Sequence, residues 1–360
     1  MNLIRKVKHY YKRAYAMGHH PSLSEVLFSD KKVLIYYGFL GDNNYGDELV
    51  YNATKALFSD VTLLPVSRYT PHMLRLLVAM DLKKIIGIVI GGGTVVGNFN
   101  SAAVFEKLAE SGRPVYMHGT GVKELIVDQK AWKTVTKNEV FGGVRGPMSV
   151  QNMMQIKEGA KIVGDAAFAL FTDNKFVDRK KDIKRVLINL GTHVPYEGQE
   201  FFRKEFNDFI SHLISENYNV SYVPFHEIDL ELGMALKNTF PEINIIEQPE
   251  GFEQCADIFA DCTFAIGERL HFTVLAIMTK TPFISINYAK KHEDLLLSLS
   301  IPHIGISPAE ASKDKMLTAF NSRLAFEWTP IKTKLQGYKD FQSEQKQKFI
   351  NRCKDVRSKA

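Results

Sequence analysis

Residues 85–93 read IIGIVIGGG, an apolar run that ends in three consecutive glycines. Apolar and polar residues do not alternate in it, so the strand that it predicts should be covered on both faces. Residues 33–39 (VLIYYGF) form a second such run, followed by a loop rich in Gly, Asn and Asp and by an amphipathic stretch over 47–58. Buried strands that alternate with helices are typical of a parallel sheet with helical crossovers.

The same alternation continues and then restarts after a charged stretch at residues 173–184, which we interpret as a linker. A chain of 360 residues is long for a single hydrophobic core. We therefore predict an α/β protein of two facing Rossmann-like domains, over 31–175 and 176–335, with a cleft between them. A basic segment over 1–30 precedes them, and a helix within 336–360 could pack back on the first domain. Further strands are predicted over 114–117, 186–190, 220–225, 243–247, 263–266 and 283–286, and helices over 101–111, 199–216, 230–238, 271–279 and 340–359.

Composition and charge narrow the function classes. The chain is 45% hydrophobic and 24% charged, which is ordinary for a globular protein. Part of its net charge of +6 comes from residues 1–20, which hold five basic residues and no acid. We interpret these as a solvated helix face, with peripheral contact to an anionic membrane as the alternative. No nucleic-acid-binding pattern, signal peptide or membrane span is evident, so we expect a cytoplasmic protein.

The three cysteines form neither a disulfide framework nor a metal-binding motif. We expect Cys255 and Cys262 to behave as small core residues. No bound metal or cofactor is predicted.

Asn44, Gly46 and Asp47 lie between the first strand and its helix. A glycine there allows close approach of a ligand to the backbone, and a helix N-terminus offers N–H groups to an anion. The loop is not a P-loop, because Asp47 stands where that motif has lysine. Asp47 could equally cap the helix.

Gly91, Gly92 and Gly93 indicate that something comes close to the backbone after the strand at 85–90. A tight turn without a ligand is the alternative. The spacing to Gly97 does not match G-x-G-x-x-G, so a dinucleotide site is only weakly supported.

Arg145 follows a predicted strand and precedes Gly146 and Pro147. A guanidinium there can pair with a carboxylate or phosphate through two hydrogen bonds, or with a neighbouring acid. Asp165, at another strand end, either holds Arg145 or caps a helix.

Residues 267–272 (GERLHF) join the strand at 263–266 to an apolar helix. Arg269 and His271 stand on either side of Leu270, so both could face one cleft at the strand-to-helix junction. An arginine fixes an anion, and a histidine can move protons near neutral pH.

Taken in order, these motifs resemble those of the polysaccharide pyruvyl transferase family over residues 33–292. The family pattern is N-x-G-D-E (44–48), a glycine-rich strand end (91–93), H/Q-G-x-G (118–121), R-x-x-x-S (145–149), G-D (164–165), R-L-H (269–271) and Y-x-x-K (288–291). One departure is Gly146, where the family usually has aspartate. Lys290 and Lys291 both stand near the family's lysine.

The resemblance implies a glycosyltransferase-B type fold, phosphoenolpyruvate as donor substrate and no cofactor. The acceptor would be a sugar of a bacterial surface polysaccharide, free or lipid-linked, that receives a pyruvate ketal as phosphate leaves. Neither the acceptor sugar nor an oligomeric state is predicted. The candidate catalytic residues are His271, Arg269 and Arg145; the candidate substrate-binding residues are Asn44, Gly46, Asp47, Gly91, Gly92, Gly93, His118, Gly119, Gly121, Asp165, Glu268, Tyr288, Lys290 and Lys291.

Two other functions fit the same organisation. A nucleotide-sugar-dependent glycosyltransferase could share the fold, since fold alone does not select between donors. A non-catalytic polysaccharide-binding protein is the second alternative, although sugar binding by itself does not require Arg269 and His271.

Overall fold

The structure is a computed structural model that describes residues 32–40, 43–66, 84–97, 110, 112–178, 183–191, 195–322 and 325–358. The basic segment over 1–30 and, except for Glu110, the helix predicted over 101–111 lie outside these residues. The chain divides into two compact units. Unit 1 comprises the described residues of Met1–Asn43, Asp47–Leu170 and Gly337–Ala360, and unit 2 those of Asn44–Gly46 and Phe171–Gln336.

Unit 1 contains a five-stranded sheet in the order β2-β1-β3-β4-β5, and every strand pair in it is parallel. β2 was not predicted in sequence, and β5 was predicted only as the strand that ends before Arg145. β2 contains Pro65, which an edge strand tolerates because only one of its sides is hydrogen-bonded to a neighbour. The strands are β1 (Val33–Tyr37), β2 (Thr62–Val66), β3 (Ile85–Ile90), β4 (Val115–Thr120) and β5 (Val140–Val144).

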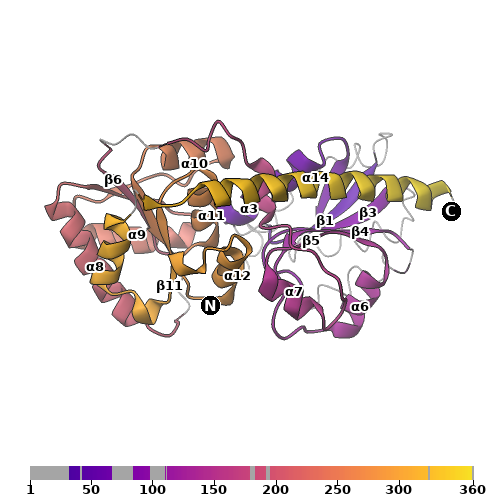
Figure 1. Ribbon diagram of the computed structural model, residues 1–360, viewed down its shortest axis with the longest axis horizontal. Helices are drawn as coiled ribbons and strands as arrows, with labels where there is room; N and C mark the ends of the chain where they lie inside the picture. The colour runs from indigo at the N-terminus through magenta and orange to yellow at the C-terminus, as the bar shows by residue number, and fades with distance from the viewer. Residues whose placement is uncertain are drawn as a thin grey trace, which may run out of the picture. The chain divides into compact units, whose positions relative to one another are not determined.

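Helices cover both faces of this sheet (Figure 1). On one face, α6 (Gln129–Lys137) and α7 (Pro147–Met153) bury Trp132 and Met153 in the core. On the other, α3 (Tyr45–Leu57) and the long C-terminal helix α14 (Thr329–Ser358) pack on the strands. A 3₁₀ helix, η1 (Ala166–Leu170), completes the unit.

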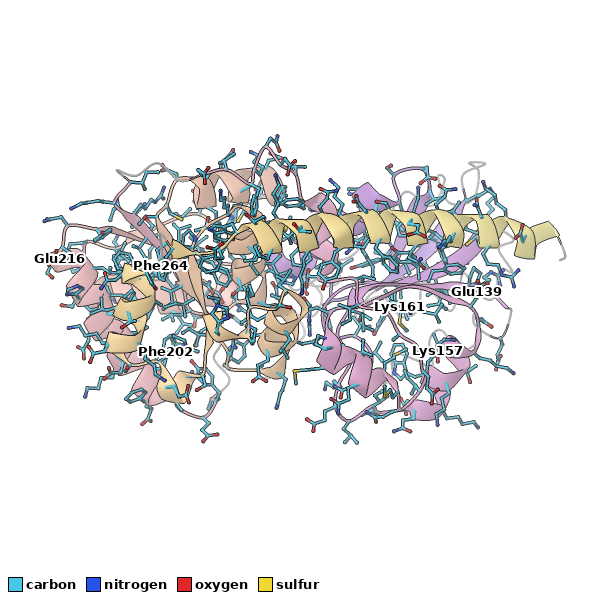
Figure 2. The ribbon with its side chains drawn as sticks, viewed as in Figure 1. Glu139, Lys157, Lys161, Phe202, Glu216 and Phe264 are labelled. Atoms are coloured by element: carbon cyan, nitrogen blue, oxygen red, sulfur yellow. The ribbon has the colours of Figure 1, made fainter. Side chains whose placement is uncertain are left out.

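Unit 2 contains a six-stranded parallel sheet in the order β11-β10-β9-β6-β7-β8. Its core is rich in phenylalanine, including Phe202 and Phe264, which are labelled in Figure 2. The strands are β6 (Arg185–Asn189), β7 (Asn219–Tyr222), β8 (Asn244–Ile245), β9 (Phe264–Gly267), β10 (Phe283–Ile286) and β11 (Gly305–Ile306).

Helices alternate with the strands of unit 2 as the sequence predicts, but the α-helices over 251–260, 290–298 and 313–321 were not predicted. All nine residues of α11 are buried, which explains why its sequence is apolar all round rather than amphipathic. The helices are α8 (Gln199–Ser215), α9 (Glu227–Thr239), α10 (Gly251–Ala260), α11 (Leu270–Met278), α12 (Lys290–Ser298), α13 (Lys313–Asn321) and the 3₁₀ helices η2 (Pro302–Ile304) and η3 (Pro308–Glu310). The prediction of two Rossmann-like α/β halves is confirmed.

The strand order reverses once in each sheet, between β1 and β3 in unit 1 and between β6 and β9 in unit 2. Parallel α/β sheets bind ligands beyond the carboxyl ends of the strands at such a switch point. Gly91–Gly93 directly follow β3, and Glu268 and Arg269 directly follow β9. Both glycine-rich and charged motifs therefore lie where this architecture places its ligands.

The C-terminal helix begins at Thr329, earlier than the predicted residue 340, and its residues from Gly337 onward belong to unit 1. Gln342 lies at the centre of that contact and is fully buried. Its amide nitrogen donates to the backbone oxygens of Val163 (2.9 Å) and Asp165 (3.3 Å), and its own backbone oxygen accepts from the Tyr116 hydroxyl (2.8 Å). One side chain thus joins α14 to β4 and to the loop before η1.

The cysteines Cys255, Cys262 and Cys353 are free and buried, so the interpretation of Cys255 and Cys262 as core residues is confirmed. Among the described helices, none is long and apolar enough to cross a bilayer.

Candidate active site

The segment Asn44–Gly46 clusters with unit 2 through backbone and side-chain hydrogen bonds. Tyr45 donates from its backbone nitrogen to the Phe225 oxygen (2.8 Å) and from its hydroxyl to the Gly251 oxygen (2.8 Å). Asn44 caps α3, because its side-chain oxygen accepts from the Gly46 nitrogen (3.0 Å). The alternative that Asp47 caps this helix is wrong, since the helix begins two residues earlier and Asp47 lies in its first turn.

His271 lies against Gly46. The histidine occupies the first turn of α11 and is 8% exposed. A Cβ atom built on Gly46 would come 2.1 Å from Nδ1 of His271 and 2.7 Å from its Cγ. Only glycine leaves room for the ring, so the fold brings Gly46 and the Arg-x-His junction, far apart in sequence, into direct contact.

Arg269 is the N-cap residue of α11, and Asp229 of α9 holds its guanidinium. Nε donates to one carboxylate oxygen (3.1 Å) and Nη2 to the other (2.5 Å). Although burial opposes the charge, the hydrogen bonds and the charge of Asp229 raise the pKa of Arg269. Asp229 therefore anchors the Nε–Nη2 edge of the guanidinium.

Glu268 is fully buried and its carboxylate is occupied by protein donors. It accepts from the Gly191 nitrogen (2.8 Å), from Nη2 of Arg203 (3.0 Å) and from the Tyr196 hydroxyl. Burial and the charge of Glu268 together raise the pKa of Tyr196 well above its usual range. Three donors compensate the buried charge and fix the turn that carries Arg269.

Tyr288 and Lys291 extend the same cluster. The Tyr288 ring lies 5.5 Å from the Tyr196 ring and 4.9 Å from the His292 ring, centroid to centroid. Nζ of Lys291 lies 5.1 Å from the centre of the Tyr288 ring, whereas Lys290, the first residue of α12, is exposed. The structure therefore distinguishes the two adjacent lysines: Lys291 stands over the aromatic pair.

The glycines Gly91–Gly93 are required by side chains of unit 1 itself. A Cβ on Gly91 would lie 2.3 Å from the Tyr36 hydroxyl oxygen, and one on Gly92 would lie 2.7 Å from Cγ1 of Val50. Gly93 has a left-handed backbone, with φ of 81°. The close approach predicted from these glycines is present, and the groups that approach belong to β1 and α3.

The His118–Gly121 segment lies at the end of β4, which extends to Thr120 instead of ending at residue 117. Gly119 has φ of 62°, and a Cβ on it would come 2.5 Å from the Gly164 oxygen, so the H-G-x-G and G-D motifs touch. Asp165 accepts from the Ala167 nitrogen (3.0 Å) at the start of η1. The helix-capping alternative for Asp165 is confirmed.

Arg145 follows β5 and is only 2% exposed. Its backbone nitrogen donates to the Thr120 oxygen (3.0 Å). A Cβ on Gly121 would lie 2.7 Å from Nη2 of Arg145 and 2.9 Å from Oγ1 of Thr94. The guanidinium therefore lies at the carboxyl ends of β3 and β4, against a glycine that leaves room for it.

His118 is fully buried between α3 and α14. The side-chain nitrogen of Gln342 donates to two backbone oxygens. Its side-chain oxygen therefore faces Nε2 of His118 (3.3 Å) as an acceptor. The ring therefore donates from Nε2, and its Nδ1 lies 2.8 Å from the Thr54 hydroxyl oxygen. Burial lowers the pKa of His118 to about 4, against the opposing effect of Gln342, so the ring is neutral near pH ~7.

This histidine makes the folded chain sensitive to acid. Between pH 6.5, the usual histidine pKa, and pH 4 the unfolded chain binds a proton at His118 that the folded chain does not. Stability should therefore fall as the pH drops through this range, by up to about 3 kcal/mol from this residue. Urea unfolding at several pH values should show a shallower loss in a His118→Gln variant. Parallel curves for the two proteins would contradict the assignment.

The residues that hydrogen-bond Glu268 and Arg269 were not predicted from the sequence. Asn189 and Gly191 had a signal, because Asn189 lies at the end of a predicted strand and Gly191 directly follows it. Asn189 accepts from the Arg269 nitrogen (3.1 Å). Asp229 and Arg203 carry no local signal, since each lies inside or near the start of an ordinary amphipathic helix and meets its partner only through tertiary packing.

The candidate residues thus form two groups, one in each unit. Arg145, Asp165, Asp47 and the glycines after β3 and β4 belong to unit 1. Asn44, Gly46, Glu268, Arg269, His271, Tyr288, Lys290 and Lys291 belong to unit 2. The convergence of Arg145 on Arg269 and His271 stays a prediction. Within the described ranges no group of His, Cys, Asp and Glu side chains could hold a metal ion.

The fold is that of two-domain enzymes of the glycosyltransferase-B class. UDP-GlcNAc 2-epimerase from Methanocaldococcus jannaschii, solved with UDP-GlcNAc and UDP, is similar with a TM-score of 0.54 at 13% identity, over 83% of this chain and 94% of that one. The corresponding enzyme from Rickettsia bellii has a TM-score of 0.54 at 11% identity, over 89% and 96%. An Anabaena protein solved with UDP and glucose has 0.52 at 10% identity, over 88% and 95%. At these identities the likeness shows the fold alone.

No curated protein shows significant sequence similarity to the chain. The family model for polysaccharide pyruvyl transferase matches residues 44–290, which run from the Asn44 cap to Lys290. The chain therefore belongs to the polysaccharide pyruvyl transferase family.

Proposed function

We propose that the chain transfers the pyruvyl group of phosphoenolpyruvate to a sugar of a bacterial surface polysaccharide or its lipid-linked precursor, forming a ketal. The observation that carries this is the contact between Gly46 and His271, with Arg269 anchored beside it as the cap of the same helix. A histidine and a guanidinium that Asp229 anchors along one edge, both at the switch point of unit 2, suit proton transfer on an anionic substrate.

The reaction adds one proton to the methylene carbon of phosphoenolpyruvate, which makes the neighbouring carbon electrophilic. A sugar hydroxyl attacks that carbon and loses its proton, and a second hydroxyl then displaces phosphate and closes the ketal ring. The two hydroxyl protons end on the new methyl group and on the departing phosphate. His271 is our candidate for these proton transfers, a role typically worth about 10²–10⁴ in rate.

Arginines suit a donor with two anionic groups. Arg145, buried at the strand ends of unit 1, and Arg269 in unit 2, whose side chain is 18% exposed, would each bind a phosphate or carboxylate oxygen of the donor. Charge-assisted hydrogen bonds of this kind contribute about 1.5–3 kcal/mol each. Asp229 acts through Arg269, since it orients the guanidinium without touching the donor.

The direct test incubates the protein with phosphoenolpyruvate and candidate saccharides, and follows phosphate release together with the mass of the acceptor. Phosphate release coupled to a gain of one pyruvyl group supports the proposal. Release of a nucleotide from a nucleotide sugar would identify a glycosyltransferase instead, and no product in either assay would favour a binding protein.

Arg269→Lys should weaken phosphoenolpyruvate binding at least tenfold. A lysine is a point charge, so it cannot pair with both oxygens of Asp229 and still present a second edge to the donor. Calorimetric titration of the donor measures the effect. Arg185→Lys is the matched control, because Arg185 pairs with Asp261 at the amino end of β6 in the same unit and should leave affinity unchanged. An unaltered affinity for Arg269→Lys would exclude the donor contact.

A further inference from the structure

Unit 1 has a basic depression on the helical face of its sheet that is opposite α14. Its volume is about 760 Å³, and four lysines line it. Three belong to α6, and Lys157 follows α7 and donates to the Thr136 oxygen at 2.7 Å. Figure 1 shows α6 and α7 across the sheet from α14, and Figure 2 shows Lys157 beside α6. The depression lies away from the strand ends that carry Arg145.

The charge of this face comes from α6. Lys130, Lys133 and Lys137 are spaced by three and four residues, so they project from one side of the helix. The helix contains no acidic residue, and none of its lysines forms an ion pair with any residue that the structure describes. Three solvated positive charges thus remain to pair with an external anion.

Large apolar side chains are exposed on the segments that flank α6 and α7. Leu125 is 76% exposed and Val127 46%, both in the loop before α6, and Met154 at the end of α7 is 63% exposed. The neighbouring Gln155 joins the two segments, since it donates to the Glu124 oxygen (2.8 Å) and accepts from Gln129 (3.2 Å). These hydrogen bonds hold the loop with Leu125 and Val127 next to the end of α7 with Met154, so three exposed apolar side chains lie on neighbouring segments.

We propose that this α6 surface, formed by Leu125, Val127, Met154, Lys130, Lys133 and Lys137, docks on an anionic phospholipid membrane. The apolar side chains enter the boundary between headgroups and acyl chains, and the lysines pair with lipid phosphates. A hydrated polyanion such as an acidic polysaccharide would satisfy the lysines but would leave the apolar side chains in water. The acidic Glu124 and Asp128 flank the loop, so the attraction depends on α6.

Sedimentation with phosphatidylcholine vesicles that contain phosphatidylglycerol tests the charge. We expect the full chain to bind these vesicles, to bind pure phosphatidylcholine weakly, and to dissociate as salt increases. Each lysine near an anionic surface contributes about fivefold, so replacing Lys130, Lys133 and Lys137 by glutamine should lower partitioning on the order of 100-fold. The matched control replaces Lys204, Lys313 and Lys315 of unit 2 by glutamine and should keep native binding.

A fluorescent reporter tests insertion of the apolar side chains. The three native cysteines are buried, so a Leu125→Cys variant can be labelled selectively with an environment-sensitive dye. Anionic vesicles should shift its emission to the blue. A label at Met234→Cys, which replaces an equally apolar side chain 52% exposed in unit 2, should not respond.

Three results would overturn the proposal. The first is that the native chain does not bind anionic vesicles. The second is that the lysine variant binds as tightly as the native chain, which would assign the membrane contact to another segment such as residues 1–20. Vesicle binding without a spectral shift at position 125 would indicate a purely electrostatic contact of the kind that a soluble polyanion makes. None of these measurements requires phosphoenolpyruvate, so they stand apart from the proposed reaction.

Discussion

Replacing His271 by glutamine should lower the turnover of phosphoenolpyruvate about 10²–10⁴-fold while donor affinity stays near the native value. Glutamine keeps a polar side chain of similar length but cannot exchange a proton near neutral pH. The ring lies against Gly46 in the first turn of α11, and the anchored Arg269 beside it would still bind the donor. Initial rates of phosphate release, together with calorimetric donor binding, separate the two quantities.

The matched control for this variant is His303→Gln, which changes an exposed histidine of η2 in the same unit. It should leave both rate and affinity unchanged. Native turnover in the His271 variant would remove His271 from the chemistry. A loss of donor affinity equal to the loss of rate would instead make it a binding residue.

Gly46→Ala should lower turnover by about the same factor as removal of His271, with the fold intact. The added methyl group would stand 2.1 Å from Nδ1, far inside any non-bonded contact, so the imidazole has to leave its position. Gly46 has no left-handed backbone that alanine would strain. The effect should therefore act through the ring. Turnover and the free energy of unfolding are both measured for this variant.

A double-mutant cycle tests whether Gly46→Ala acts through the His271 ring. In a His271→Ala background the methyl group of Ala at position 46 meets no ring, so Gly46→Ala should cause no further loss of turnover and should recover stability. The control is Gly337→Ala in α14, where an added Cβ meets nothing within 4 Å. That change should be neutral or stabilise by about 0.5–1 kcal/mol. Additive losses at Gly46 and His271 would contradict the contact.

The strands of both sheets could largely be predicted from the sequence, because a parallel strand covered on both faces is an apolar run with clear ends. The runs at 85–90 and 283–286 coincide with β3 and β10. Less regular strands were harder to bound: β2 contains a proline and was not predicted, whereas β5 contains two glycines and only its end before Arg145 was predicted. The neighbours of these strands stabilise them, and that information is not local.

Motifs at strand ends could also be read in sequence, since turns that carry ligands use glycine, proline and charged residues. The sequence predicted Arg269, His271 and Gly46 as candidates, yet it contained nothing to pair Gly46 with His271. Tyr36 and Val50 pack where Cβ atoms on Gly91 and Gly92 would lie, and ligand binding at Gly91–Gly93 stays a prediction. A glycine in the sequence indicates that a Cβ atom would clash at that position, but it does not indicate which group lies there.

By itself, the sequence determined the α/β class, most of the strands and the positions of the charged residues at strand ends, because all of these depend on local apolar periodicity and turn chemistry. Tertiary structure alone decided which partners those residues meet. Asp229 anchors Arg269, Gln342 sets the proton position of His118, and Gly46 makes room for His271. Each is a contact between segments distant in the chain, and its energy comes from burial and hydrogen bonding that exist only after the sheets have assembled.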